Sequence, residues 1–233
     1  MRRKLSTIGV AAVAALSLGV AACGDDDDEG TAGSSAAAET THADSRSGAG
    51  TETGAAELRA TLTAGLQEHV YLAGIAITNG VGSGLDSPEF EASAATLDKN
   101  SVALSEAIGS VYGPDAGEQF LALWRDHIGF FADYTAAKAE GDEKGAAAAR
   151  KELDGYRAEF GAFLASANPE LTKDAVAEEL KPHVNSVFDA IDAVVAGSPK
   201  AFDLLRTAAG HMPGTANTLA GAIAKQFPDK FSG

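Results

Sequence analysis

The feature that most constrains the fold is a turn signal that returns at a nearly constant interval. The tripeptides GPD (113–115), NPE (168–170) and FPD (227–229) have similar form, and their prolines are 55 and 59 residues apart. Glycine and proline interrupt regular helices, and an interval of this length is typical of a repeated helical hairpin. The sequence therefore predicts one structural unit that is present three times.

Between these signals, apolar residues recur at intervals of three and four, which is the spacing of one buried helix face. The predicted helices span residues 55–79, 88–111, 115–140, 143–166, 170–196 and 199–227. Ser87 before Pro88 and Ser198 before Pro199 predict capped helix starts. No segment alternates with period two for long enough to predict a strand. We expect an all-α domain in residues 55–233, a six-helix bundle built from three repeated antiparallel helical hairpins.

The N-terminus predicts export. A basic stretch at residues 2–4, followed by apolar residues 5–22, is typical of a secretory signal peptide. It ends in Val20-Ala21-Ala22-Cys23, which resembles the lipobox of bacterial lipoproteins. The resemblance implies that the signal peptide, residues 1–22, is removed and that Cys23, the only cysteine, carries lipid such as palmitate. It also implies an outward-facing location on the cell membrane. The alternative is an ordinary secretory signal with an incidental cysteine.

Residues 23–54 contain no large apolar side chain and begin with an acidic run at 25–29. Such a segment cannot bury a core, so it predicts a flexible tether. The whole chain has a formal net charge of −15, and removal of the signal peptide, with its three basic residues, would make it −18. Nucleic acid is therefore not an expected partner, because binding phosphates needs a basic surface.

Histidines occupy equivalent positions in the predicted hairpins. His69, His127 and His183 are 58 and 56 residues apart, and each lies on the apolar face of its helix. His211 is as far as His183 from the turn near Gly197, which predicts that these two lie at the same height. We therefore expect the four histidines to form one layer across the bundle.

Imidazole is a common ligand of Cu(II), Zn(II) and haem iron, so at least two of the four histidines are candidate metal ligands. Protons compete with metals for imidazole, and we expect affinity to fall near pH 6.5. Glu68 and Asp126 each precede a histidine and are candidates to orient an imidazole of a neighbouring helix. Two alternatives stay open. The histidines could be core residues of a structural or protein-interaction module of the cell envelope, or axial ligands of non-covalent haem.

Motifs for catalysis are missing from the sequence. It contains no His-Glu-x-x-His, no Gly-x-Ser-x-Gly and no phosphate-binding loop, so we do not expect an enzyme. The tail AKQFPDKF (224–231), together with the acid–histidine pairs at 68–69 and 126–127, resembles a group of secreted or surface-attached bacterial helical proteins without an established activity. This resemblance implies no reaction.

Overall fold

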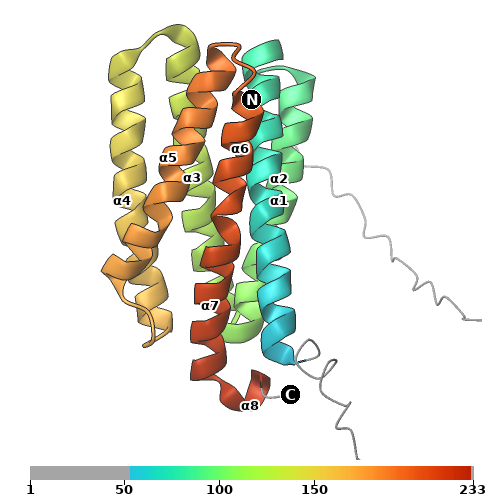
Figure 1. Cartoon of the computed structure of the whole chain (residues 1–233), viewed down its shortest axis with the longest axis vertical. Coiled ribbons are helices and arrows are strands. Elements are labelled where there is room, and N and C mark those ends of the chain that lie inside the picture. Colours follow the sequence, from blue (N-terminus) through green and yellow to red (C-terminus); the bar gives the residue numbers. More distant parts are fainter. Residues whose placement is uncertain (1–52, 232–233) are drawn as a thin grey trace, which may run out of the picture. The chain divides into compact units, whose positions relative to one another are not determined.

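The computed structural model describes residues 53–231, and all of the regular secondary structure in this range is helical (Figure 1). The helices are α1 (Gly54–Ser83), α2 (Pro88–Tyr112), α3 (Pro114–Glu140), α4 (Glu143–Ala167), α5 (Lys173–Val195), α6 (Ala201–Gly210), α7 (Met212–Gln226) and α8 (Pro228–Phe231). The all-α prediction is confirmed for this part of the chain. Within it, no helix combines the length and the hydrophobicity that crossing a lipid bilayer requires. The predicted signal peptide, the lipidated Cys23 and nearly all of the predicted tether lie outside the described residues.

One predicted helix start is confirmed and the other is wrong. The Ser87 hydroxyl accepts a hydrogen bond from the Phe90 N–H at 3.1 Å, and Pro88 occupies the first turn of α2. By contrast, α6 begins only at Ala201. The Ser198 carbonyl accepts a hydrogen bond from the Ala201 N–H at 3.1 Å, so the residues around the second proline form a turn before the helix.

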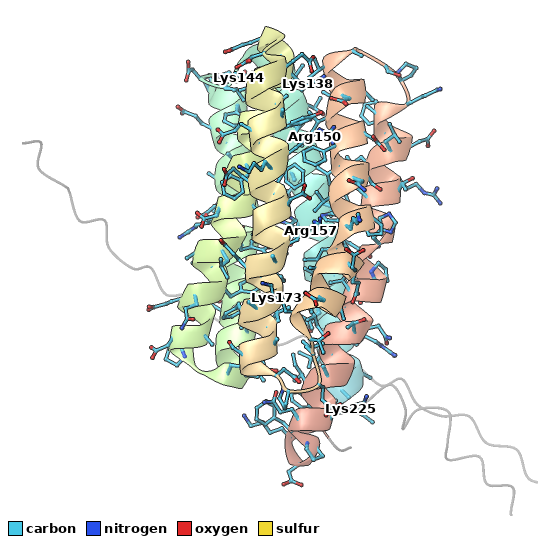
Figure 2. The ribbon with its side chains drawn as sticks, turned by 90° about the vertical axis from the view of Figure 1, so that its left-hand side faces the viewer. Lys138, Lys144, Arg150, Arg157, Lys173 and Lys225 are labelled. Atoms are coloured by element: carbon cyan, nitrogen blue, oxygen red, sulfur yellow. The ribbon has the colours of Figure 1, made fainter. Side chains whose placement is uncertain are left out.

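The predicted helix 199–227 is also wrong as a single element, because it is divided at His211 into α6 and α7. Pro213 has no N–H to donate to the carbonyl four residues earlier, and its ring crowds that carbonyl. Pro182 has the same defect but stays inside α5. Near this proline, Arg157 of α4 donates from Nη1 to the Ala177 carbonyl of α5 at 2.7 Å (Figure 2).

Each short connection reverses the chain direction, so α1, α3 and α5 run the same way and the helices between them run back (Figure 1). Consecutive long helices pack side by side, and α6 and α7 return to pack against α1. The helices α1, α3 and α5 also contact one another, which makes them the innermost three. Any side chain on the inner faces of these helices is therefore directed into the centre of the domain.

The centre is apolar and rich in aromatic rings. Tyr134, Leu153, Phe160 and Ile191 are among the most deeply buried side chains. Burial of this kind is the main source of stability in a helical domain without disulfides, because most helix stability in proteins comes from packing of the apolar face. The histidines of α1, α3 and α5 lie in this core.

Candidate functional site

Three of the four predicted histidines are buried in the core. His69 on α1 and His127 on α3 are each 4% exposed, and His183 on α5 is 7% exposed. Their helices place them there because the residues one turn away on the same faces, such as Leu66 and Trp124, are also buried. The predicted inward direction of these three side chains is correct.

The structure brings His69 and His127 into direct contact. Their Nε2 atoms are 3.3 Å apart, and the ring planes are inclined by 48°. At most one proton fits between two such nitrogens, so one ring donates and the other accepts. The Nδ1 atoms of both rings are buried and have no hydrogen-bond partner. The accepting ring carries its proton on Nδ1, and an unpaired buried donor of this kind costs about 1–3 kcal/mol.

Aromatic rings surround the pair. The Trp124 ring centroid lies 4.8 Å from that of His69 and 4.6 Å from that of His127, and its buried Nε1 also has no partner. Tyr156 stacks on His127 at 4.9 Å with an interplanar angle of 22°. Burial, with the charge of Asp126 as a second cause, raises the pKa of Tyr156 well above its ordinary value. The two imidazoles therefore sit in an apolar aromatic cage.

His183 is next to the pair but makes a different bond. Its Nδ1 lies 3.2 Å from the Ala208 carbonyl oxygen. A carbonyl can only accept, so this contact assigns the proton to Nδ1 and leaves the Nε2 lone pair free. His183 lines one cavity of about 30 Å³ with His69 and another of about 30 Å³ with His127.

His211 lies at the junction of α6 and α7 and is only half-buried. Its Nε2 is 3.2 Å from the hydroxyl of Ser186, which stands on α5 one turn after His183. The predicted similarity in height between these two histidines therefore agrees with the structure. His211 therefore lies beside the three buried histidines, and it takes no part in the contact between His69 and His127.

The two carboxylates that precede histidines have other surroundings. Glu68 Oε2 accepts a hydrogen bond from Asn100 Nδ2 of α2 at 2.7 Å, and Asp126 is exposed. Within residues 53–231 neither carboxylate hydrogen-bonds to an imidazole. A residue that precedes a core residue lies about 100° round the helix, which here directs Glu68 to the neighbouring helix. Asn100 was not anticipated from the sequence, although an asparagine in the apolar phase of a helix is a signal for a buried polar contact.

Burial keeps the three core histidines neutral. It lowers the pKa of His69 to about 3, with the charge of His183 as a second cause. It lowers the pKa of His183 to about 4, against an opposing effect of the bond to Ala208. The pKa of His127 also lies well below its ordinary value, first because of burial and then because of the other two histidines. Each ring therefore keeps an available nitrogen lone pair in moderately acidic solution.

The largest of the cavities beside the pair measures about 70 Å³ and borders both His69 and His127. Its walls are otherwise nearly all apolar, and the hydroxyl of Thr135 is already bonded to the Phe131 carbonyl. Within residues 53–231, no group of three or more histidine, cysteine, aspartate or glutamate side chains is placed to hold a metal ion. The site thus provides a pair of neutral nitrogen donors in apolar surroundings.

No protein-family model, curated protein or solved structure matches this chain.

Proposed function

We propose that this chain is an exported, lipid-anchored helical protein that sequesters or carries a transition-metal ion between His69 and His127. The observation that carries the proposal is the 3.3 Å separation of the two Nε2 atoms. Imidazole nitrogens bind Zn(II) at 2.0–2.1 Å, and two such ligands at a tetrahedral angle lie about 3.3 Å apart. The pair therefore has the spacing of two metal ligands before any metal is added.

The protonation state supports the same proposal. A metal ion needs deprotonated ligands, and burial holds the pKa of His69 at about 3. The loss of affinity expected near pH 6.5 from the sequence moves to more acidic solution, because protons do not compete at the ordinary pKa of histidine. A bound ion would also replace the contact between the two Nε2 atoms, which is a long hydrogen bond of 3.3 Å. His183 and His211 are not ligands in this proposal, because no group of three or more such side chains among residues 53–231 is placed to hold one ion, and His211 contacts Ser186 instead of the pair.

The proposed architecture is three repeated hairpins, α1–α2, α3–α4 and α5–α6/α7. Equivalent corners of these hairpins meet at one end of the domain. Asn168 Nδ2 donates to the Tyr112 hydroxyl at 2.9 Å, and that hydroxyl donates to Gln226 Oε1 at 3.0 Å. A repeat of this kind explains why histidines recur on α1, α3 and α5, but it does not explain why only two of them touch.

The proposed location follows from the sequence at residues 1–54: a lipid on Cys23 anchors the protein on the outer side of the cell membrane, and an acidic tether separates it from the bundle. The net charge, which becomes −18 without the signal peptide, supports the proposal that nucleic acid is not a partner. Sequestration or transport fits a site made of ligands better than catalysis does, and we therefore propose that the protein is not an enzyme.

A second candidate function is that of a protein-interaction module of the cell envelope. It is favoured by large apolar side chains on the surface, with Phe202 of α6 71% exposed and Ile75 of α1 51% exposed. Haem binding finds less support. The cavities beside the histidines measure about 30–70 Å³, far below the roughly 300 Å³ of a small-molecule pocket, so the core would have to open widely.

Metal titration of the purified protein tests the proposal. We expect one ion per chain, a thermal midpoint that rises with metal by mass action, and loss of both effects in His69→Gln and in His127→Gln. His211→Gln is the matched control, because it removes an imidazole that belongs to another contact. Binding that survives in His127→Gln but disappears in His211→Gln would contradict the assignment. Failure of Cu(II), Zn(II), Cu(I) and haemin alike to bind would favour the interaction module.

A further inference from the structure

We infer that the site selects monovalent copper, Cu(I), over divalent ions. This inference rests on the metal binding proposed above and goes further by naming the ion. It follows from three properties of the described residues: the charge of the donors, their number, and the aromatic ring that touches both of them.

The donors carry no negative charge. His69 and His127 can bind an ion only as neutral imidazoles, Glu68 is bonded to Asn100, and Asp126 is exposed. Moving an ion out of water has a solvation cost that rises with the square of its charge, so a divalent ion loses about four times as much as a monovalent one. Two neutral nitrogens do not offset the solvation free energy that a divalent ion loses in this apolar core, whereas the loss for a monovalent ion is much smaller.

The number of donors gives the same preference. Zn(II) in proteins takes four ligands and Cu(II) prefers a tetragonal arrangement, whereas Cu(I), with its filled d shell, is stable with three ligands, or with two that lie opposite each other. A divalent ion between His69 and His127 would have to complete its coordination with water. The adjoining cavity of about 70 Å³ has room for water, but a buried water needs two to four polar partners. Thr135 already donates to the Phe131 carbonyl, so the walls offer few partners.

Trp124 supplies the third property. Among residues 53–231 it is the one aromatic ring in contact with both imidazoles, at centroid distances of 4.8 and 4.6 Å. Indole attracts cations at its face more strongly than the other aromatic side chains, and the attraction grows where water is absent. It can stabilise a cation without adding an anionic ligand. With bonds of about 2.0 Å, nitrogens 3.3 Å apart subtend about 111° at the ion, which leaves one side open toward a third partner.

Trp124 is also the only tryptophan of the chain, so its fluorescence reports on this site alone. The experiment uses the full purified protein without oxygen and titrates it with Cu(I) from a colourimetric chelator of known affinity. Parallel titrations use Zn(II) and, in air, Cu(II). We expect one equivalent of Cu(I) to bind, to quench Trp124 fluorescence, and to bind at least 100-fold more tightly than Zn(II) at pH 7.

Two variants separate the ligands from the ring. His127→Gln is expected to abolish Cu(I) binding. Trp124→Phe, which keeps a ring in the core, is expected to weaken Cu(I) binding about fivefold. Tyr156→Phe is the control, because its ring stacks on His127 but does not touch His69. Equal Cu(I) affinity in Trp124→Phe and Tyr156→Phe would overturn the role of the indole.

The outcomes for the two proposals are distinct. Binding of Zn(II) or Cu(II) at His69 and His127 that equals or exceeds that of Cu(I) would overturn the inferred selectivity and leave the proposed metal site standing. Absence of binding by all three ions would overturn both. Both proposals would be supported if one equivalent of Cu(I) binds, if this binding is lost in His127→Gln, and if the affinity for Cu(I) exceeds that for Zn(II) by the expected factor.

Discussion

The buried histidines predict that acid destabilises this domain well before its carboxylates are neutralised. A histidine in the unfolded chain has a pKa of about 6.5, whereas burial holds the folded values of His69 and His183 at about 3 and 4. Below pH 6.5 the unfolded state therefore binds protons that the folded state does not. The free energy of unfolding must fall as the pH drops from 6.5 toward the folded values, and these residues contribute no pH dependence above about pH 7.

The size of the effect follows from those two values. A histidine that titrates only in the unfolded state lowers stability by about 1.4 kcal/mol for each pH unit below 6.5. Between pH 7 and pH 5, His69 and His183 together therefore remove about 4 kcal/mol, and His127 acts in the same direction. The total stability of a domain is typically about 5–15 kcal/mol, so the loss is a large part of it.

Urea unfolding followed by far-UV circular dichroism, at pH 7 and pH 5 with a metal chelator present, measures this loss. In His183→Asn the side-chain amide can still donate to the Ala208 carbonyl but cannot titrate. We expect this variant to reduce the difference between the two pH values by about 2 kcal/mol. Phe131→Leu is the control, since it weakens the same core without removing a titrating group. Wild-type stability that is equal at pH 5 and pH 7, or a pH difference unchanged in His183→Asn, would refute the reasoning.

Three further predictions concern the packing of the bundle, and urea unfolding at pH 7 tests each of them. Leu153→Ala is expected to cost about 2–5 kcal/mol, because Leu153 is fully buried in the core; a cost below 1 kcal/mol would contradict its central position. Arg150→Met is expected to cost about 1–2 kcal/mol, because the guanidinium lies 3.9 Å over the Phe188 ring and donates to the Tyr134 hydroxyl at 2.7 Å (Figure 2); an unchanged urea midpoint would show that both contacts are negligible. Ser87→Ala is expected to cost about 1 kcal/mol through loss of the α2 cap, and Ser87→Asp, which restores an acceptor, should recover most of it.

Local sequence rules predicted α1 to α5 and the direction of the core histidines, because both depend on the phase of apolar residues along one helix. They did not predict that His69 and His127 would touch while His183 bonds to Ala208. That difference depends on the rotation and offset of α1, α3 and α5 relative to one another, which no single helix determines. The same limit applies to Glu68, whose position opposite Asn100 depends on how α1 packs on α2.

The prolines show a second limit. Pro182 and Pro213 both lie inside predicted helices, yet α5 continues through Pro182, whereas the helix that contains Pro213 is divided at His211. Each proline removes one backbone hydrogen bond to the carbonyl four residues earlier, so the local chemistry does not explain why only one of the two helices is divided. The surroundings differ, since Arg157 donates to a carbonyl of α5 close to Pro182. Such a contact comes from another helix and is not readable from the residues beside the proline.

The most direct test of the central claim is X-ray absorption spectroscopy at the metal edge of the loaded protein. We predict two imidazole nitrogens at about 2.0 Å from the ion, with the outer-shell scattering characteristic of histidine, and loss of this signal in His69→Gln. A first shell made of oxygen atoms without imidazole scattering, or a spectrum that is identical in His69→Gln, would contradict the assignment of the metal to His69 and His127.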